Sequence, residues 1–201
     1  MLIHAIFAAS RANGPGMRTV VFVQGCSLGC EFCFNGSTHR FRGIEVASED
    51  VAEAVICAHR DRCLEGVTFS GGEPMQQADS VLAVMRRLRE RTPGLSFGMF
   101  SGYTERELAK GRYVIWRSEL KAQERVILWK AIRSHLDFAV LGRFNHLQPG
   151  DEPLRSSRNQ VLRLFSGRYS EADFEEQVTE VHIDQSGLAE VTGFPTLGLP
   201  F

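Results

Sequence analysis

The chain has 201 residues, of which 43% are hydrophobic and 23% are charged. This composition is typical of a globular protein, and it excludes a disordered chain or a fibrous repeat. The 23 basic and 24 acidic side chains give a formal net charge of -1. Because a nearly neutral chain has no general electrostatic attraction to nucleic acid or anionic lipid, we expect neither as a partner.

No apolar run approaches the roughly 18–20 residues that a membrane-spanning helix needs. The apolar start of the chain, Met1–Ala9, lacks the basic residues that open a secretory signal. We therefore predict a first strand there, and a cytoplasmic protein without a membrane partner.

Predicted strands and helices alternate along the chain. The hydrophobic patterns predict strands at Leu2–Phe7, Thr19–Val23, Gly66–Phe69, Leu95–Phe100, Asp137–Leu141 and Gln160–Phe165. Helices are predicted after a capping Ser48, over Gln77–Arg91, after the capping box Thr104–Glu107, and over Ser118–Ser134. This alternation predicts an α/β fold whose parallel strands are joined by right-handed crossovers.

Loops with unusual chemistry follow several of these strands, at Gln24–Gly36, Ser70–Pro74 and Ser101–Tyr103. Because the carboxyl ends of parallel strands meet at one edge of a sheet, we expect these loops to form one site.

The first of these loops contains Cys26, Cys30 and Cys33, three of the five cysteines. Clustered thiols in a reducing compartment indicate metal ligands more often than disulfides. Three thiolates are one short of a closed iron–sulfur or zinc site, so one metal position stays open; the alternative is a structural zinc completed by His39. Cys57 and Cys63 are expected to be structural or free.

The spacing Cys26-x3-Cys30-x2-Cys33, with aromatic Phe32 before the third cysteine, resembles the signature of the radical S-adenosylmethionine superfamily. Further stretches resemble the activating enzymes of glycyl-radical proteins: Asn13–Arg18, Gln24–Cys26, Cys33–Asn35, Ser70–Pro74, Ser101–Thr104 and Leu154–Gln160. Together these stretches cover residues from about 10 to 165.

Residues 166–201 lie outside the family pattern, and their own sequence pattern predicts a C-terminal β-hairpin extension that packs on the same domain. The resemblance implies a partial (β/α) barrel over residues 1–165. It also implies a 4Fe-4S cluster on Cys26, Cys30 and Cys33, with S-adenosylmethionine bound to the fourth iron. Reductive cleavage of this cofactor would give a 5′-deoxyadenosyl radical that abstracts a hydrogen atom.

Further site residues follow from the same resemblance. Gly71, Gly72 and Glu73 match the motif that holds the amino group of S-adenosylmethionine, since glycines permit close backbone approach and an acid accepts from an ammonium. Phe32 is assigned to the cofactor as part of the signature. Ser101 is a candidate for the ribose or carboxylate of the cofactor, and the alternative is a solvated turn.

At other positions the sequence allows two interpretations each. Arg18 would pair with an anionic group near the cluster, or lie in a surface ion pair. Asp137 would serve the site, or sit at a helix–strand junction. The segments Thr179–Ile183 and Leu188–Val191 are predicted to form a hairpin that covers the edge or bottom of the barrel and supplies no ligand to the cofactors, with a docking edge for a partner as the alternative.

The favoured function is the activation of a glycyl-radical enzyme, such as an anaerobic ribonucleotide reductase, with flavodoxin or ferredoxin as a reductant. An alternative is a radical S-adenosylmethionine enzyme that modifies another peptide or a small molecule, because Gly111–Arg117 and the residues after 165 depart from the family pattern. A third hypothesis is a zinc-stabilised interaction module without enzymatic activity.

Overall fold

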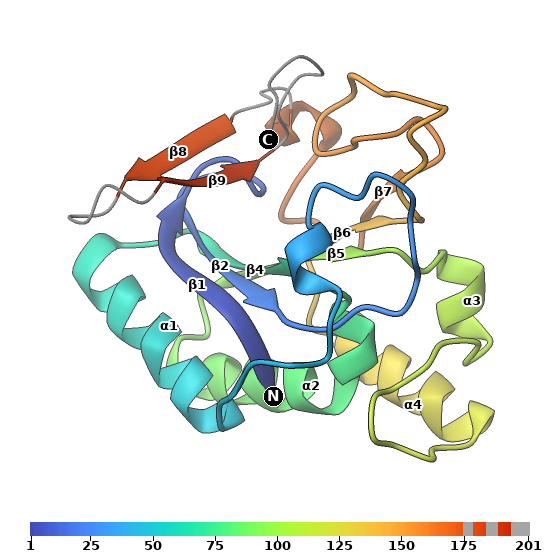
Figure 1. Ribbon diagram of the computed structural model, residues 1–201. Helices are drawn as coiled ribbons and strands as arrows, with labels where there is room; N and C mark the ends of the chain where they lie inside the picture. Colours follow the sequence, from blue (N-terminus) through green and yellow to red (C-terminus); the bar gives the residue numbers. More distant parts are fainter. Residues whose placement is uncertain (175–178, 184–188, 194–201) are drawn as a thin grey trace.

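The computed structural model describes residues 1–174, 179–183 and 189–193 (Figure 1). Its large sheet has seven strands in the order β3-β1-β2-β4-β5-β6-β7. These strands are β1 (Leu2–Ser10), β2 (Arg18–Val23), β3 (Ile44–Glu45), β4 (Gly66–Gly71), β5 (Ser96–Ser101), β6 (Phe138–Leu141) and β7 (Val161–Leu164). The helices are α1 (Ser48–Arg62), α2 (Ala78–Arg91), α3 (Glu105–Ala109) and α4 (Ala122–Arg133), and short 3-10 turns are η1 (Gly36–Thr38), η2 (Pro74–Gln77) and η3 (Glu171–Phe174). None of the described helices is long and apolar enough to cross a membrane.

The centre of the sheet is parallel, as the alternating pattern predicts. Strands β2, β4, β5 and β6 run parallel, whereas β1, β3 and β7 pair antiparallel at the two sides. The expectation of a parallel sheet is therefore wrong for the outer strands. The reason at β1 is the connection to β2, a tight turn in which Gly14 and Gly16 adopt positive φ, and such a turn is too short for the crossover that parallel pairing needs.

The helices begin close to where the sequence predicts. Thr104 and Glu107 form the predicted capping box of α3. Ser48 is not a cap, because Ala47 occupies the N-cap position of α1 and Ser48 is its first helical residue. Helix α4 starts only at Ala122, so it is shorter than predicted.

The two faces of the parallel strands have different environments. Alternate residues of a strand point to opposite faces. On one face, side chains such as Val21, Phe69 and Met99 join the main apolar core, to which α1, α2 and α4 contribute (Figure 1). On the other face, Phe22 pairs in register with Ser70 and borders the pocket described below. We call this second face the inner face.

The amino-terminal half of the inner face is built around Arg18, which is fully buried. Its guanidinium donates to the side-chain oxygens of Thr68 and Ser96 (2.8 Å each), to the Tyr169 hydroxyl (3.3 Å) and to nearby carbonyls, and it lies 5.0 Å from the centre of the Phe138 ring. Arg18 opens β2, whereas the cysteine loop follows the end of that strand. Both interpretations of Arg18 from the sequence are therefore wrong.

Asp137 has a junction role. Its carboxylate accepts from the Phe97 amide (2.9 Å) and the Ser166 hydroxyl (2.6 Å), directly before β6. It ties β5 and the chain after β7 to the start of β6, away from the pocket.

The chain after residue 165 returns to the inner face. Tyr169 and Phe174 pack edge-on against Phe138, at ring-centre distances of 6.0 and 5.1 Å. Strands β8 (Thr179–Ile183) and β9 (Ala189–Gly193) form a separate antiparallel pair. Residues 184–188, which include the predicted turn of the hairpin and the first residue of its second predicted strand, lie outside the described residues.

Replacing Arg18 by lysine should lower the free energy of unfolding by about 3 kcal/mol or more, since one ammonium cannot serve the acceptors that the guanidinium now serves and each hydrogen bond to a charged group contributes about 1.5–3 kcal/mol. Urea unfolding measures this change. Arg60→Lys on the exposed surface of α1 is the control, and it should change the value by less than about 0.5 kcal/mol. Equal losses in the two variants would contradict a stabilising role for Arg18.

Candidate cofactor site

The cysteine loop is folded back onto the end of β2. Gly25 and Cys26 donate their amides to the carbonyls of Thr38 (2.7 Å) and His39 (3.0 Å). The side-chain amide of Gln24 adds a hydrogen bond to the Arg40 carbonyl (2.7 Å). These contacts fix both ends of the loop, so the cysteines between them are held at the carboxyl edge of the sheet.

The segment Gly111–Arg117 supports this loop from outside. The Trp116 ring stacks on Phe41 at 5.5 Å, and its amide donates to the Gln76 carbonyl (2.7 Å). The Phe41 ring occupies the space that a Cβ at Gly25 would need. This departure from the family pattern therefore braces the cysteine loop.

The loop after β4 lies against the cysteine loop with no room for side chains. Gly72 donates its amide to the Val23 carbonyl (2.8 Å), and Glu73 donates to the Gly25 carbonyl (2.9 Å). A Cβ at Gly71, whose φ is +100°, would lie 2.6 Å from backbone atoms of Val23, and one at Gly72 would overlap the Gly25 carbonyl. Glycine is required at both positions by the chain's own backbone.

Glu73 is a buried clamp between two loops. Its Oε1 accepts from the Met75 amide (2.9 Å) and the Ser101 hydroxyl (2.8 Å), and its Oε2 accepts from the Gly102 amide (2.7 Å). Burial raises the pKa of Glu73 to about 7, although these donors oppose the shift. The hydroxyl of Ser101 is thus engaged with Glu73 rather than with solvent.

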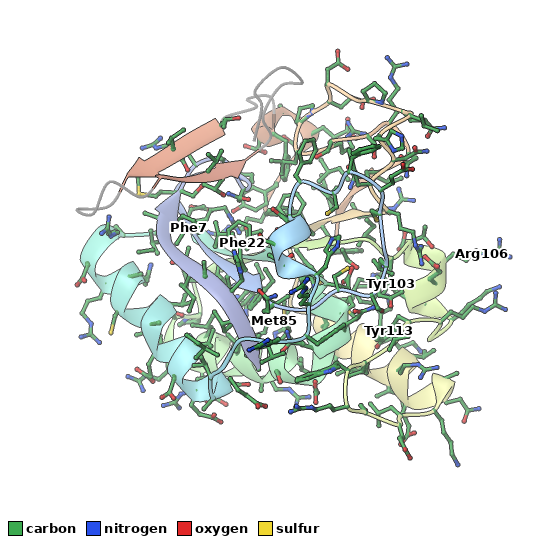
Figure 2. The ribbon with its side chains drawn as sticks, viewed as in Figure 1. Phe7, Phe22, Met85, Tyr103, Arg106 and Tyr113 are labelled. Carbon is green, nitrogen blue, oxygen red and sulfur yellow. The ribbon has the colours of Figure 1, made fainter. Side chains whose placement is uncertain are left out.

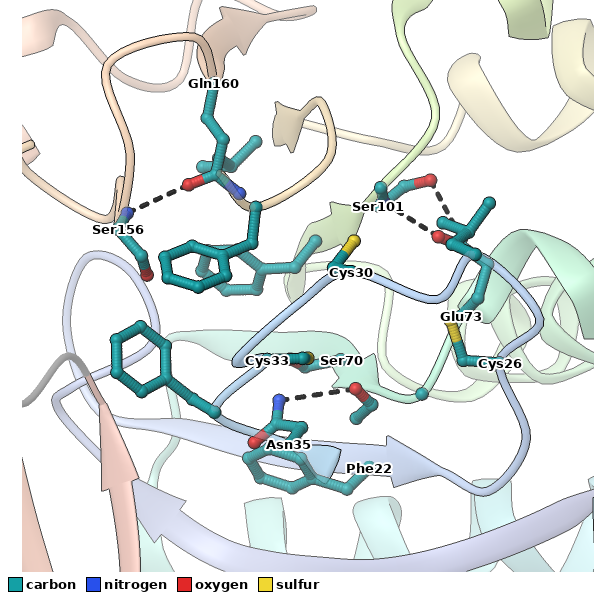
Figure 3. Close-up of a pocket in the computed structure, with 18 of the residues that line it drawn as sticks. Phe22, Cys26, Cys30, Cys33, Asn35, Ser70, Glu73, Ser101, Ser156 and Gln160 are labelled. Atoms are coloured by element: carbon teal, nitrogen blue, oxygen red, sulfur yellow. Dashed lines mark hydrogen bonds between the residues drawn. The ribbon is translucent and has the colours of Figure 1, made fainter. Parts of the chain in front are cut away.

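These loops border one pocket on the inner face (Figure 3). Its lining includes all three thiols together with Gly71, Gly72, Glu73 and Ser101. Its floor comes from inner-face residues at the strand ends, among them Phe22, Ser70, Phe100 and Val140. The Phe22 ring is held edge-on by Phe7 of β1, with ring centres 5.4 Å apart (Figure 2).

Comparison with known proteins identifies the family. A family model described as a 4Fe-4S single cluster domain matches residues 12–163. The anaerobic ribonucleoside-triphosphate reductase-activating protein of Vibrio cholerae is 28% identical over 172 residues, which cover 83% of this chain and 99% of that relative. The protein of the same name from Salmonella typhimurium is 30% identical over 112 residues, or 54% of this chain and 73% of the relative. The pyruvate formate-lyase-activating enzyme of Clostridium pasteurianum is 34% identical over 108 residues, or 49% of this chain and 45% of the relative.

The chain belongs to the radical S-adenosylmethionine family of 4Fe-4S enzymes. Members of this family use an iron–sulfur cluster and S-adenosylmethionine, so these are the cofactors of this enzyme.

The donor set at the pocket has the chemistry that a 4Fe-4S cluster needs, although the described residues bring no three such side chains together around a single metal ion. Cys26, Cys30 and Cys33 are free, partly exposed and on one loop, and thiolates are the ligands that hold such clusters. Burial raises the pKa of Cys26 to about 12 and raises that of Cys33 as well. The thiols of Cys26 and Cys33 are therefore protonated before iron arrives, and binding must release those protons.

Several candidates from the sequence lie outside this pocket. Phe32 is 72% exposed and packs against the ring of His146 at 4.8 Å. His39, the alternative zinc ligand, is absent from the described lining and contacts the loop through its carbonyl. Cys57 and Cys63 are exposed on α1 and at its end.

The sequence reasoning missed other lining residues. Phe34 and Phe144 line the pocket with their rings 4.9 Å apart. Asn35 donates its side-chain amide to the Gly71 carbonyl (3.3 Å), which links the cysteine loop to β4 once more. Gln160 lines the pocket and accepts from the Ser156 amide (2.9 Å; Figure 3). Asn35 and Gln160 belong to stretches that carry the family resemblance, so the resemblance was a signal that could have identified them as site residues.

Strand β9 also reaches the pocket, through Val191, Thr192 and Gly193. The chain after residue 165 was expected at the edge or bottom of the barrel. The place of β9 beside the pocket is a contact that this expectation did not include.

Glu73→Ala should lower the free energy of unfolding by about 3 kcal/mol, because it leaves buried amides without an acceptor at about 1–3 kcal/mol each. It should also weaken S-adenosylmethionine binding, because the loops after β4 and β5 lose their link. Urea unfolding and equilibrium dialysis of the reconstituted enzyme measure the two effects. The control is Asp61→Ala on the exposed part of α1, and equal behaviour of the two variants would contradict the clamp.

Proposed function

We propose that this enzyme activates a glycyl-radical protein, and that its substrate is an anaerobic ribonucleoside-triphosphate reductase. The observation that carries this proposal is the match to the Vibrio cholerae activating protein, which extends over 99% of that relative. The clostridial enzyme named for pyruvate formate-lyase matches over 45% of its length, so the reductase is favoured as the substrate.

Within this proposal, Cys26, Cys30 and Cys33 hold the cluster, and the backbone at Gly71 and Gly72 borders the amino-acid part of S-adenosylmethionine. When bound, the reduced cluster and S-adenosylmethionine supply the 5′-deoxyadenosyl radical that abstracts hydrogen from the partner. The protein's own contribution is to position these groups and to exclude water.

Two sets of residues divide this task. Glu73 and Ser101 keep the two loops at a fixed separation through a buried hydrogen bond. Phe22, Phe100 and Val140 give the pocket an apolar floor. An apolar floor removes water and other hydrogen donors that would quench a radical before it reaches the substrate. Phe32 keeps its assignment to the cofactor only if its exposed ring turns towards the pocket in the loaded enzyme.

The architecture within this proposal is a partial (β/α) barrel over residues 1–165, with a hairpin extension over residues 166–201. Four parallel strands with helical cover on one face and the pocket on the other support it. The contacts of Tyr169 and Phe174 with Phe138 support packing of the extension on the same domain.

The remaining partners follow from the chemistry. Cleavage needs one electron, and a low-potential protein such as flavodoxin or ferredoxin is the proposed donor.

Free thiols suit a reducing compartment, which supports the cytoplasm as the location. The net charge of -1 supports a protein without a nucleic-acid or membrane partner.

A second candidate is a radical S-adenosylmethionine enzyme that modifies a different peptide or a small molecule. The position of β9 favours keeping it, because the family model ends at residue 163 and β9 nevertheless lines the pocket. The zinc-stabilised module has no such support.

Anaerobic reconstitution should load about four irons per chain. Alanine at Cys26, Cys30 or Cys33 should abolish loading, because each removes one of three thiolate ligands. Cys57→Ala and Cys63→Ala are matched controls and should load like the wild type. Iron and acid-labile sulfide analysis decides, and a protein that holds one zinc ion without sulfide would falsify the assignment.

The reconstituted enzyme, given dithionite and S-adenosylmethionine, should generate a stable organic radical on a purified anaerobic ribonucleoside-triphosphate reductase. Electron paramagnetic resonance detects this radical, and Cys30→Ala is the negative control. Cleavage of S-adenosylmethionine without a radical on the reductase would favour the second candidate.

A further inference from the structure

The chain beyond the family match contributes a wall to the pocket. Val191, Thr192 and Gly193 of β9 line it, although the family model ends at residue 163. Strand β9 pairs only with β8 among the described strands, and the two form a separate sheet beside the end of β1 (Figure 1).

A buried hydrogen bond holds this wall in place. The side-chain amide of Asn13 donates to the Thr192 hydroxyl (2.8 Å), and both residues are 3% exposed. The Asn13 carbonyl accepts from Thr68 of β4 (2.8 Å), and Thr68 accepts from Arg18. The anchor of β9 is therefore continuous with the rigid amino-terminal half of the inner face.

Strand β8 is attached to the same loop. The Arg11 amide donates to the Glu180 carboxylate at 3.0 Å. Both strands of the pair thus depend on the turn between β1 and β2 for their position over the pocket.

The anchor of β9 and the cysteine loop are attached to different parts of the central strands. Thr68, to which Asn13 is bonded, precedes the lining residue Ser70 by two positions, or about 6–7 Å of strand. The cysteine loop follows the opposite, carboxyl end of β2. The anchor of β9 is therefore in the amino-terminal half of the inner face, whereas the cysteine loop lies at its carboxyl edge.

Val191 is the apolar side chain of this wall. It is 42% exposed and pairs in register with Val181 of β8, which is 58% exposed and does not line the pocket. Residues directly opposite each other in an antiparallel pair share a face. Val181 is thus a matched control for Val191.

We propose that β9 is the substrate-facing wall of the pocket, with Val191 as a specificity-determining residue and Asn13 as a positioning residue that acts through Thr192. The substrate is an extended polypeptide segment whose reacting residue must pass between β9 and the cysteine loop. This inference rests on the proposed activase function. It assigns substrate selection to a segment outside the family match.

The test compares Val191→Trp with Val181→Trp in the reconstituted full-length enzyme. The indole at position 191 should narrow the pocket beside β9. It should lower the radical yield on the reductase by about tenfold or more, since a displacement of the reacting residue by about 1 Å costs up to a hundredfold in rate. Iron content and S-adenosylmethionine binding, measured by equilibrium dialysis, should persist, which shows that the variant is folded. Val181→Trp should give the wild-type radical yield.

The outcomes separate the two proposals. A wild-type enzyme that leaves the reductase without a radical overturns the activase function and this inference with it. A wild type that activates, together with a Val191→Trp variant that activates equally well, overturns the inference alone. Loss of S-adenosylmethionine binding in Val191→Trp with normal iron would also overturn it, because β9 would then face the cofactor.

The positioning role has its own test. Thr192→Val removes the acceptor of the Asn13 amide and should raise the KM for the reductase about fivefold, the effect of one typical hydrogen bond, with little change in kcat. Thr192→Ser keeps the hydroxyl and should restore the wild-type KM. A structural defect alone would lower kcat or iron content in both variants, and that result would overturn the role of Asn13.

Discussion

The loops after β2 and β4 approach each other so closely that only backbone fits between them. The amides of Gly72 and Glu73 donate to the carbonyls of Val23 and Gly25, and a Cβ at Gly71 or Gly72 would collide with that backbone. This contact fixes the start of the cysteine loop relative to the sheet. The site depends on it, because a cluster-binding loop that could shift would not keep three thiols at the same pocket as the strand ends.

The amino-terminal half of the inner face is polar and is also held rigidly. It buries Arg18 among neutral acceptors, and the Tyr169 hydroxyl, which accepts from Arg18, donates to the carboxylate of Glu65 (2.7 Å). Burial lowers the pKa of the Arg18 guanidinium, which Tyr169 and Glu65 oppose. A buried charge with many hydrogen bonds tolerates little displacement. Arg18 therefore makes this half a rigid base under the pocket.

Much of this arrangement follows from local sequence signals, and the rest does not. The cysteine spacing and the strand–helix alternation predict the loop and the parallel core, because both are properties of neighbouring residues. The burial of Arg18 depends on Ser96 and Tyr169, which lie 78 and 151 positions away, and no periodicity encodes such contacts. The same holds for Glu73: the sequence marks an acid at the right place, but its bond to Ser101 appears only when two strand ends meet.

The cysteine loop and β9 are attached to the rest of the fold through different residues, so the two can vary separately. The cysteine loop is tied to β4 through Gly72 and Glu73, whereas β9 is tied to the turn before β2 through Asn13 and Thr192. No described hydrogen bond joins β9 directly to the cysteine loop. A substitution in β9 therefore changes one wall of the pocket without straining the backbone that holds the thiols. In such a design the radical-generating end stays constant while the wall that meets the substrate is free to differ among relatives.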